Sequence, residues 1–161
     1  MDQCLDTGNS RPPCAARRYG SCLTSVMLDG ARVLVADDDP LLLATVADAL
    51  THLAAKVTSA ASGAELIEQM ANEGPFDLVV TDISMPWMNG LQAMQAARTA
   101  GVGTSVIFMT ALADERIPAQ VRALGENALL LRKPFDLSQL GAAASGLLAR
   151  KRTTAGSRTP P

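Results

Sequence analysis

Residues 31–40 read ARVLVADDDP: an apolar run of strand-forming residues leads directly into three aspartates and a proline. An unbroken run of Val, Leu and Ala is typical of a parallel strand that is buried on both faces. Asp39 before Pro40 is typical of a helix start, because the aspartate caps free backbone N–H groups and the proline fits the first turn. The stretch therefore predicts a buried strand, a short acidic turn and a helix.

The same unit repeats toward the C-terminus. Strand patterns cover residues 32–36, 55–59, 77–81, 105–109 and 128–131. Helices are expected to begin near Pro40, Gly63 and Leu137, and two more to lie at residues 91–99 and between Asp114 and Leu124. Five strands that alternate with five helices predict an α/β fold with a doubly wound parallel sheet and helices on both faces.

Two of the helix starts resemble capping boxes, and one helix contains a proline. Ser62 with Glu65, and Asp136 with Gln139, have the spacing at which two side chains satisfy free N–H groups at a helix start. Pro118 must either start the fourth helix or break it.

The two ends of the chain lack this periodicity. Residues 1–28 are predicted to be a disordered extension and residues 150–161 a disordered basic tail, which leaves a folded domain at residues 29–149. The three cysteines, Cys4, Cys14 and Cys22, lie in the extension and are interpreted as incidental thiols, because a disulfide framework would spread through the fold. We hypothesise that translation starts at Met27, just before the first strand.

Composition and charge exclude several classes of function. The chain is 48% hydrophobic, enough for the core of one domain, and it carries 14 Lys and Arg against 16 Asp and Glu. The net charge of −2 gives no general attraction to nucleic acid or anionic membranes, so direct nucleic-acid binding is not expected. No apolar run approaches the roughly 20 residues that span a bilayer, so we expect no membrane insertion and a cytoplasmic location.

Polar residues follow four of the five predicted strands. They are Asp37, Asp38 and Asp39 after the first, Asp82 after the third, Thr110 after the fourth and Lys133 after the fifth. Because the carboxyl ends of parallel strands share one edge of the sheet, these side chains are expected to meet there. Gathered carboxylates repel by several kcal/mol per pair at an effective dielectric of about 20, so a cation must offset them. Hard oxygen ligands with room for water and phosphate suit Mg²⁺, which predicts a magnesium site.

Asp82 is the candidate nucleophile toward a phosphoryl group, with an acyl phosphate as the product. Lys133 would pair with the carboxylate at rest and with a phosphoryl oxygen afterwards, while the Thr110 hydroxyl could turn to donate a hydrogen bond to the new anion. Taken singly, each residue has a structural explanation: helix caps, a solvated loop lysine and a turn threonine. Their occurrence together at strand ends favours the chemical explanation.

The motifs ARVLVADDDP, DLVVTDISMPWMNG, VIFMTA and LLLRKPF resemble those of response regulator receiver domains in order and spacing, over about residues 31–149. The resemblance implies a flavodoxin-like sheet of strand order 2-1-3-4-5. It also implies these site residues: Asp82 as phosphoacceptor, Asp37 and Asp38 as the acidic pair with Asp38 as the more direct Mg²⁺ ligand, the Ser84 main-chain carbonyl as a further ligand, Thr110 as the switch hydroxyl and Lys133 as the site lysine.

The resemblance also implies partners. A receiver accepts phosphate from a histidine kinase or histidine phosphotransfer protein and then acts on a downstream protein, with a phosphorylation-dependent homodimer as a further option. The residues after the last predicted helix are too few for an effector domain, so a single-domain receiver is expected. We expect no enzyme activity beyond catalysis of its own phosphorylation and dephosphorylation.

One position departs from the family pattern. Leu130 stands three residues before Lys133, where receivers usually carry a Tyr or Phe that moves inward together with the threonine. A leucine has neither a hydroxyl nor a flat ring. The phosphorylation chemistry is therefore expected to persist, while the response of the output surface is expected to weaken or to use repacking.

Two other functions stay open. A haloacid dehalogenase-like phosphatase also uses an aspartyl phosphate, Mg²⁺, Thr and Lys, and Asp37 with Asp39 has its D-x-D spacing, but that family places the nucleophile after the first strand. A pseudo-receiver that binds partners without phosphorylation is favoured by Leu130 and opposed by the complete set of site residues. His52 is interpreted as structural or exposed, and Trp87 as a partly exposed loop residue or partner contact.

Overall fold

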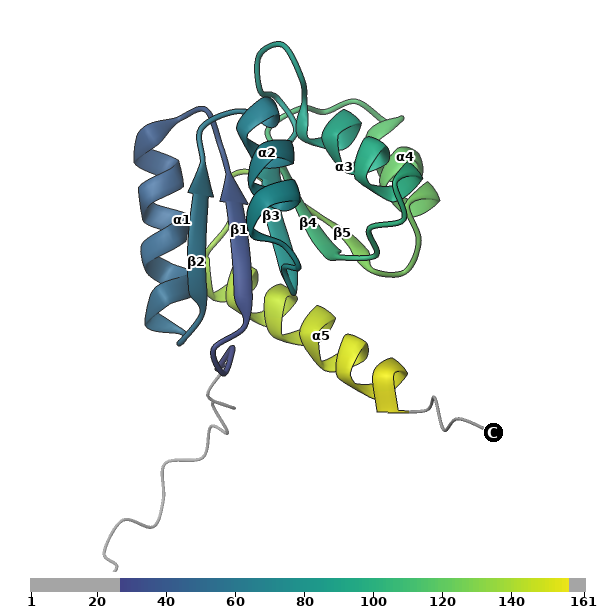
Figure 1. Cartoon of the computed structure of the whole chain (residues 1–161). Coiled ribbons are helices and arrows are strands. Elements are labelled where there is room, and N and C mark those ends of the chain that lie inside the picture. Colours follow the sequence, from purple (N-terminus) through teal and green to yellow (C-terminus); the bar gives the residue numbers. More distant parts are fainter. Residues whose placement is uncertain (1–26, 157–161) are drawn as a thin grey trace, which may run out of the picture.

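The computed structural model describes residues 27–156, which form five strands and five helices in alternation (Figure 1). Their bounds are β1 Arg32–Ala36, α1 Pro40–His52, β2 Lys56–Ala60, α2 Gly63–Glu73, β3 Leu78–Asp82, α3 Gly90–Thr99, β4 Ser105–Thr110, α4 Ile117–Ala123, β5 Ala128–Arg132 and α5 Leu137–Gly156. Each predicted strand boundary lies within one residue of the observed one. The predicted alternation of strands and helices is confirmed.

All five strands are parallel, in the order β2-β1-β3-β4-β5, as the resemblance implied. The register pairs Ala36 of β1 with Thr81 of β3, and Asp82 of β3 with Met109 of β4. The carboxyl ends of these three neighbouring strands are therefore level with one another. The strand order reverses between β1 and β3, which is where doubly wound folds bind their ligands.

Helices cover both faces of the sheet and form two hydrophobic clusters. One cluster joins residues of β1, β3 and β4 to α1 and α5, and includes Val33, Val35, Val80, Ile107, Leu50 and Leu140. The other joins the opposite faces of the same strands to α2, α3 and α4, and includes Leu34, Val79, Phe108, Leu66, Met94 and Val121. The three inner strands are buried on both sides, which explains their unbroken apolar runs.

The helix starts follow local side-chain chemistry. The Asp39 carboxylate accepts hydrogen bonds from two N–H groups in the first turn of α1, at 2.9 and 3.3 Å. Ser62 accepts from the Glu65 N–H at 3.2 Å, but the Glu65 carboxylate accepts from Ala61, so this capping box is shifted by one residue. Pro118 lies in the first turn of α4 and therefore starts that helix instead of breaking it.

Two boundaries of the folded part differ from the sequence prediction. Leu28, assigned to the N-terminal extension, is buried, and its N–H donates to the Leu53 carbonyl at 2.7 Å. Helix α5 continues to Gly156, into the predicted tail, where Lys151 pairs with Asp77 at 3.1 Å. Residues 1–26 and 157–161 lie outside the described residues, and so do the three cysteines. A translation start at Met27 stays a prediction.

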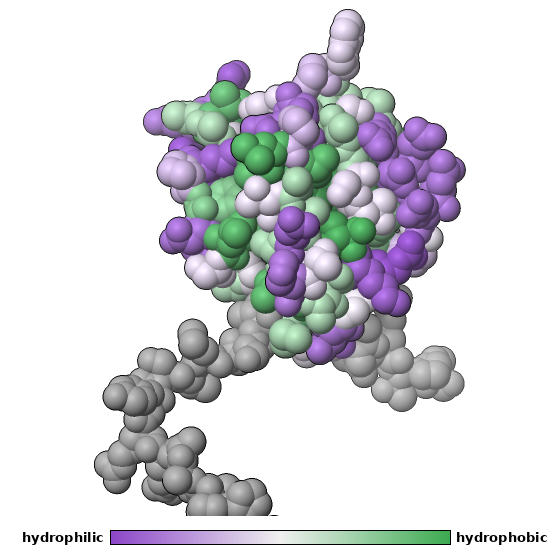
Figure 2. Space-filling view, turned by 90° about the vertical axis from the view of Figure 1, so that its left-hand side faces the viewer, coloured by the Kyte–Doolittle hydropathy of each residue, from purple (hydrophilic) through white to green (hydrophobic). Residues whose placement is uncertain are grey.

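The edge of the sheet where the strands start and the edge where they end carry different parts of the chain. The described chain begins and ends at the edge where the strands start, while the β3–α3 loop projects at the opposite edge (Figure 1). Figure 2 shows the same loop as a narrow projection at the top, above a surface in which apolar and polar residues are mixed. Within residues 27–156, none of the helices has the length and apolarity needed to cross a membrane.

Candidate functional site

The centre of the site is Lys133, whose ammonium joins two carboxylates from different strands. Its Nζ lies 2.5 Å from Oδ1 of Asp82, at the end of β3, and 3.1 Å from Oδ2 of Asp37, just after β1. The side chains of Asp37 and Asp82 are 1% and 5% exposed, and that of Lys133 is 21% exposed. The fold therefore brings together three residues that are far apart in sequence, at the edge predicted for them.

The remaining carboxylate oxygens are held by the turns that follow the strands. Oδ1 of Asp37 accepts a hydrogen bond from the Asp39 N–H at 2.9 Å, and Oδ2 of Asp82 accepts one from the Ser84 N–H at 2.5 Å. Every oxygen of the two carboxylates thus has a donor, which fixes the orientation of both groups. These two backbone donors were missed by the sequence analysis, because only the side chain of Asp39 and only the carbonyl of Ser84 were considered there.

The charges in the cluster do not balance. Because both carboxylates contact one Nζ atom, their nearest oxygens are at most about 5.6 Å apart, and at an effective dielectric of about 20 they repel by at least about 3 kcal/mol. Burial, together with the Asp82 charge, raises the pKa of Asp37. Burial lowers the pKa of Lys133, but its hydrogen bonds to Asp82 and Asp37 outweigh this and raise it. One ammonium is thus shared between two acids.

Asp38 is not part of this cluster. Its side chain is exposed, and in the described part of the chain no three His, Cys, Asp or Glu side chains gather closely enough to hold a metal ion. Mg²⁺ needs fewer protein ligands, because it usually keeps several waters and takes one or two carboxylates. Asp37, Asp82 and the carbonyl of exposed Ser84 therefore have donor chemistry that fits Mg²⁺. The roles of Asp38 and of the Ser84 carbonyl as ligands stay predictions.

Thr110 is buried beside the cluster but makes no side-chain contact with it. Its hydroxyl oxygen accepts a hydrogen bond from the Leu112 N–H at 3.0 Å, and its main-chain carbonyl accepts one from the Lys133 N–H at 2.8 Å. Both contacts leave the hydroxyl hydrogen free to be donated. Thr110 thus connects the end of β4 both to the lysine and to the loop that leads to α4.

Two glycines let the backbone close around the phosphoacceptor candidate. A Cβ atom on Gly90 would lie 2.2 Å from the main-chain oxygen of Asp82 and 2.5 Å from Oγ1 of Thr81. A Cβ on Gly63, at the start of α2, would lie 2.1 Å from the main-chain oxygen of Met88. Gly63 carried no sign of this role in the sequence, because the contact joins two loops that are distant along the chain.

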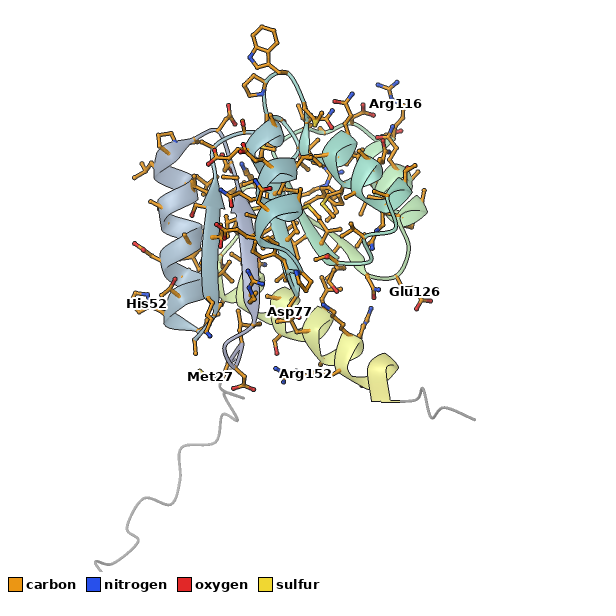
Figure 3. The ribbon with its side chains drawn as sticks, in the orientation of Figure 1. Met27, His52, Asp77, Arg116, Glu126 and Arg152 are labelled. Carbon is orange, nitrogen blue, oxygen red and sulfur yellow. The ribbon has the colours of Figure 1, made fainter. Side chains whose placement is uncertain are left out.

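Leu130 and His52 lie where a structural role explains them. Leu130 pairs with Phe108 across β4 and β5 and packs, partly buried, against the cluster formed with α2, α3 and α4. His52 is exposed at the end of α1, with Nδ1 2.7 Å from the Asp48 carbonyl oxygen, and Figure 3 shows it at the edge away from the site. Neither side chain forms a hydrogen bond or an ion pair with the Lys133 cluster.

Known proteins share both the sequence pattern and the fold. A family model described as the response regulator receiver domain matches residues 33–145. The transcriptional regulatory protein CrdR of Helicobacter pylori is 35% identical over 112 residues, which cover 69% of this chain and 52% of that protein. A probable chemotaxis protein CheY of Rhizobium etli is 33% identical over 114 residues, covering 70% of this chain and 88% of that protein.

A solved response regulator receiver protein from Sinorhizobium medicae is 30% identical, with a TM-score of 0.67 over 76% of this chain and 97% of that one. The chain spans about half the length of the transcriptional regulators that it matches, but most of the length of the chemotaxis protein. On these matches, and with Asp37, Asp82 and Lys133 gathered at the ends of the strands, the chain belongs to the response regulator receiver domain family of two-component signalling.

Proposed function

We propose that Asp82 accepts a phosphoryl group from a histidine kinase or a histidine phosphotransfer protein, and that the chain relays the signal by binding another protein. The observation that carries the proposal is the bridge from Lys133 to Asp82 and Asp37 in a nearly buried site. The domain acts as a switch, and as a catalyst only of its own phosphorylation and dephosphorylation. A cytoplasmic location stays our expectation.

The residues of the cluster divide the work of phosphoryl transfer. A carboxylate oxygen of Asp82 forms a bond to phosphorus while the bond from phosphorus to the donor's imidazole nitrogen breaks, and the freed nitrogen takes up a proton. The Ser84 N–H, on Oδ2, keeps the carboxylate oriented during the attack. Lys133 is already at Oδ1, so a small movement of its Nζ brings its charge onto a phosphoryl oxygen.

Asp37, Asp82 and the Ser84 carbonyl would hold Mg²⁺, with exposed Asp38 as a further ligand, and the bound ion would supply positive charge to the phosphoryl oxygens. Asp37 has a second task in the resting protein, where it shares the Lys133 ammonium with Asp82. Once Lys133 turns to the phosphoryl group, Asp37 loses this ionic partner and keeps the hydrogen bond from the Asp39 N–H. The cluster thus changes its charge distribution as well as its shape when Asp82 is modified.

Thr110 connects the change of charge at Asp82 to the surface formed by the β4–α4 loop. If its hydroxyl turns to donate to the phosphoryl group, it gives up its present contact with the Leu112 N–H. The β4–α4 loop would then rearrange, and with it the surface offered to a downstream protein or to a second copy of the chain. Leu130 would follow by repacking, because it lacks the hydroxyl and ring of the usual aromatic residue.

A labelling experiment tests the proposal. The purified chain is incubated with Mg²⁺ and phosphoramidate, and its intact mass is measured together with that of Asp82→Asn and Asp114→Asn. We expect one phosphate on the wild type and on Asp114→Asn, whose carboxylate is exposed and pairs with Arg116, and none on Asp82→Asn. Labelling that persists in Asp82→Asn would contradict the proposal. Continuous hydrolysis of a phosphate monoester would favour the phosphatase instead.

Leu130 favours a second candidate, a pseudo-receiver that binds its partner regardless of phosphorylation. The two candidates differ in what Asp82→Asn does to binding of a downstream protein. A pseudo-receiver would bind equally well with either residue, whereas a phosphorylation switch would lose the affinity change that phosphoramidate produces in the wild type.

A further inference from the structure

Trp87 is the most conspicuous residue that the proposed chemistry does not use. The residue is fully exposed, so nothing in the described part of the chain covers it. Its φ angle is 68°, in the left-handed region that bulky residues rarely adopt, and the Met88 N–H closes the turn by donating to the Pro86 carbonyl at 2.8 Å. Both the exposed indole and the backbone conformation disfavour tryptophan here, so folding does not explain its presence.

The structure holds this exposed residue in a fixed place. On one side Met85 is buried in the core cluster, and on the other the main-chain oxygen of Met88 rests against Gly63 of α2. Asn89 then caps α3 through a complete capping box. The turn that contains Trp87 therefore has an anchor on each side, and the β3–α3 loop to which it belongs projects from the edge where the strands end (Figure 1). An aromatic side chain displayed in this way is ready to be buried by a partner without much loss of backbone freedom.

The position of Trp87 indicates which partner covers it. Trp87 is five positions after Asp82, so the two Cα atoms are at most about 18 Å apart. A typical protein interface buries about 800 Å² on each partner, which is a disc of roughly 16 Å radius. The two lengths are comparable, so a protein that delivers a phosphoryl group to Asp82 has the β3–α3 loop within reach of its interface, whereas a small phosphodonor is too small to contact both.

We infer that Trp87 is the anchoring residue by which the chain recognises a protein phosphodonor, and so determines its preference for that donor over small phosphate compounds. This inference rests on the proposed function. The same edge carries exposed Asp38 and Asp39 and the exposed side chain of Leu41 at the start of α1. The complementary surface is therefore a phosphohistidine protein with an apolar pocket for the indole, bordered by basic residues.

The test compares two kinds of donor on three proteins. The three proteins are the wild type, Trp87→Gly and the control Leu112→Ser, and each receives phosphate from one of two donors. One donor is phosphoramidate, and the other is a ³²P-labelled histidine phosphotransfer protein. This protein donor is chosen from a panel as one that labels the wild type. Leu112 is half-exposed on the neighbouring β4–α4 loop, so its replacement removes apolar surface at the same edge. Gly suits the positive φ of residue 87, so Trp87→Gly removes the indole without straining the loop.

We expect kcat/KM with the protein donor to fall by about 30-fold in Trp87→Gly, as for a hot-spot residue, and to stay within about twofold in Leu112→Ser. Phosphoramidate should label all three proteins at the same rate. An unchanged rate with the protein donor, or an equal loss with both donors, would overturn the inference. A wild type that takes phosphate from phosphoramidate but from no protein in the panel would also overturn it. Failure of phosphoramidate to label even the wild type would count against the proposed function instead.

Fluorescence provides a readout apart from phosphoryl transfer. Trp87 is the only tryptophan in the chain, so its emission reports its own surroundings. A tryptophan-free donor whose phosphorylatable histidine is replaced should shift the emission to the blue on binding. Binding without any shift would show that the donor leaves the indole in water, contrary to the inference.

Discussion

Replacing Lys133 by methionine should destabilise the protein, because the change leaves two buried carboxylates facing each other. At an effective dielectric of about 20, the contacts at 2.5 and 3.1 Å correspond to gross attractions of about 5 to 7 kcal/mol each. Desolvation of the three groups cancels much of this, and loss of one partner from a buried ion pair costs about 3 to 5 kcal/mol. Since the Lys133 side chain is 21% exposed, we expect a loss near the lower end, about 3 kcal/mol.

The pH dependence of this loss has a defined sign. Burial already raises the pKa of Asp37 above its unfolded value, and removal of the ammonium raises it further. A carboxyl group with a raised folded pKa destabilises the protein when ionised, so the penalty is full above that pKa and shrinks as the pH falls through it. The deficit of Lys133→Met should therefore be larger at about pH 8 than at about pH 5. A cation that binds only the folded state adds to its stability. Mg²⁺ should stabilise the variant more than the wild type, because the variant lacks the ammonium that offsets the two carboxylates.

Urea unfolding followed by far-ultraviolet circular dichroism at both pH values, with and without Mg²⁺, measures these effects. Lys56→Met is the matched control, because Lys56 is exposed on the edge strand β2 and its loss should change stability by about 0.5 kcal/mol or less. A Lys133→Met variant within that same margin of the wild type at both pH values would refute the reasoning. So would a deficit that grows on acidification.

Three further predictions concern packing and charge away from the lysine. Gly90→Ala should lower the free energy of unfolding by about 1 to 3 kcal/mol, because its Cβ would meet the Asp82 oxygen, whereas Gly146→Ala, with nothing within 4 Å, should raise it by about 0.5 to 1 kcal/mol. Burial raises the pKa of Asp77, but hydrogen bonds from the Arg32 N–H and Lys151 outweigh this and lower it. Asp77→Asn should therefore reduce the free energy of unfolding by at most about 1 kcal/mol at neutral pH after solvent screening, and urea unfolding below the folded pKa of Asp77 should show no reduction. Leu130→Tyr should lower the free energy of unfolding by about 1 to 3 kcal/mol through overpacking, measured by urea unfolding. Phosphoramidate should still label Asp82 at the wild-type rate, since the Leu130 side chain supplies no charge or hydrogen bond to the cluster.

The fold could be predicted from the sequence because its signals are local. The buried runs of β1, β3 and β4 and the caps at Asp39 and Ser62 depend only on neighbouring residues. The ends of the domain depend on distant contacts, and there the prediction differed from the structure. Helix α5 runs past residue 150 where Lys151 reaches Asp77 and Arg152 reaches Asp29, the latter at 3.5 Å (Figure 3). A basic segment in a sequence gives no sign of the acids that it will meet.

The site could be predicted as far as strand ends determine it. Asp37, Asp82 and Lys133 meet because the sheet brings those ends together. Asp38 does not join them, because it lies in the bend between β1 and α1 with its side chain exposed. The N–H donors of Asp39 and Ser84 escaped prediction for another reason. Every residue except proline carries an N–H group, and only the geometry of the turn decides which one faces a carboxylate.

If Asp82 is phosphorylated as we propose, the shared ammonium predicts that a cation stabilises the modified state more than the resting one. At rest Lys133 divides one positive charge between Asp37 and Asp82, and the cluster has a single excess negative charge. A phosphoryl group on Asp82 adds about one further negative charge and attracts the ammonium to itself. Asp37 is then left buried with only the Asp39 N–H as its partner, and an isolated buried carboxylate is costly. The two effects are thermodynamically linked. If phosphorylation of Asp82 tightens the binding of a dication, then a bound dication favours phosphorylation by the same free energy.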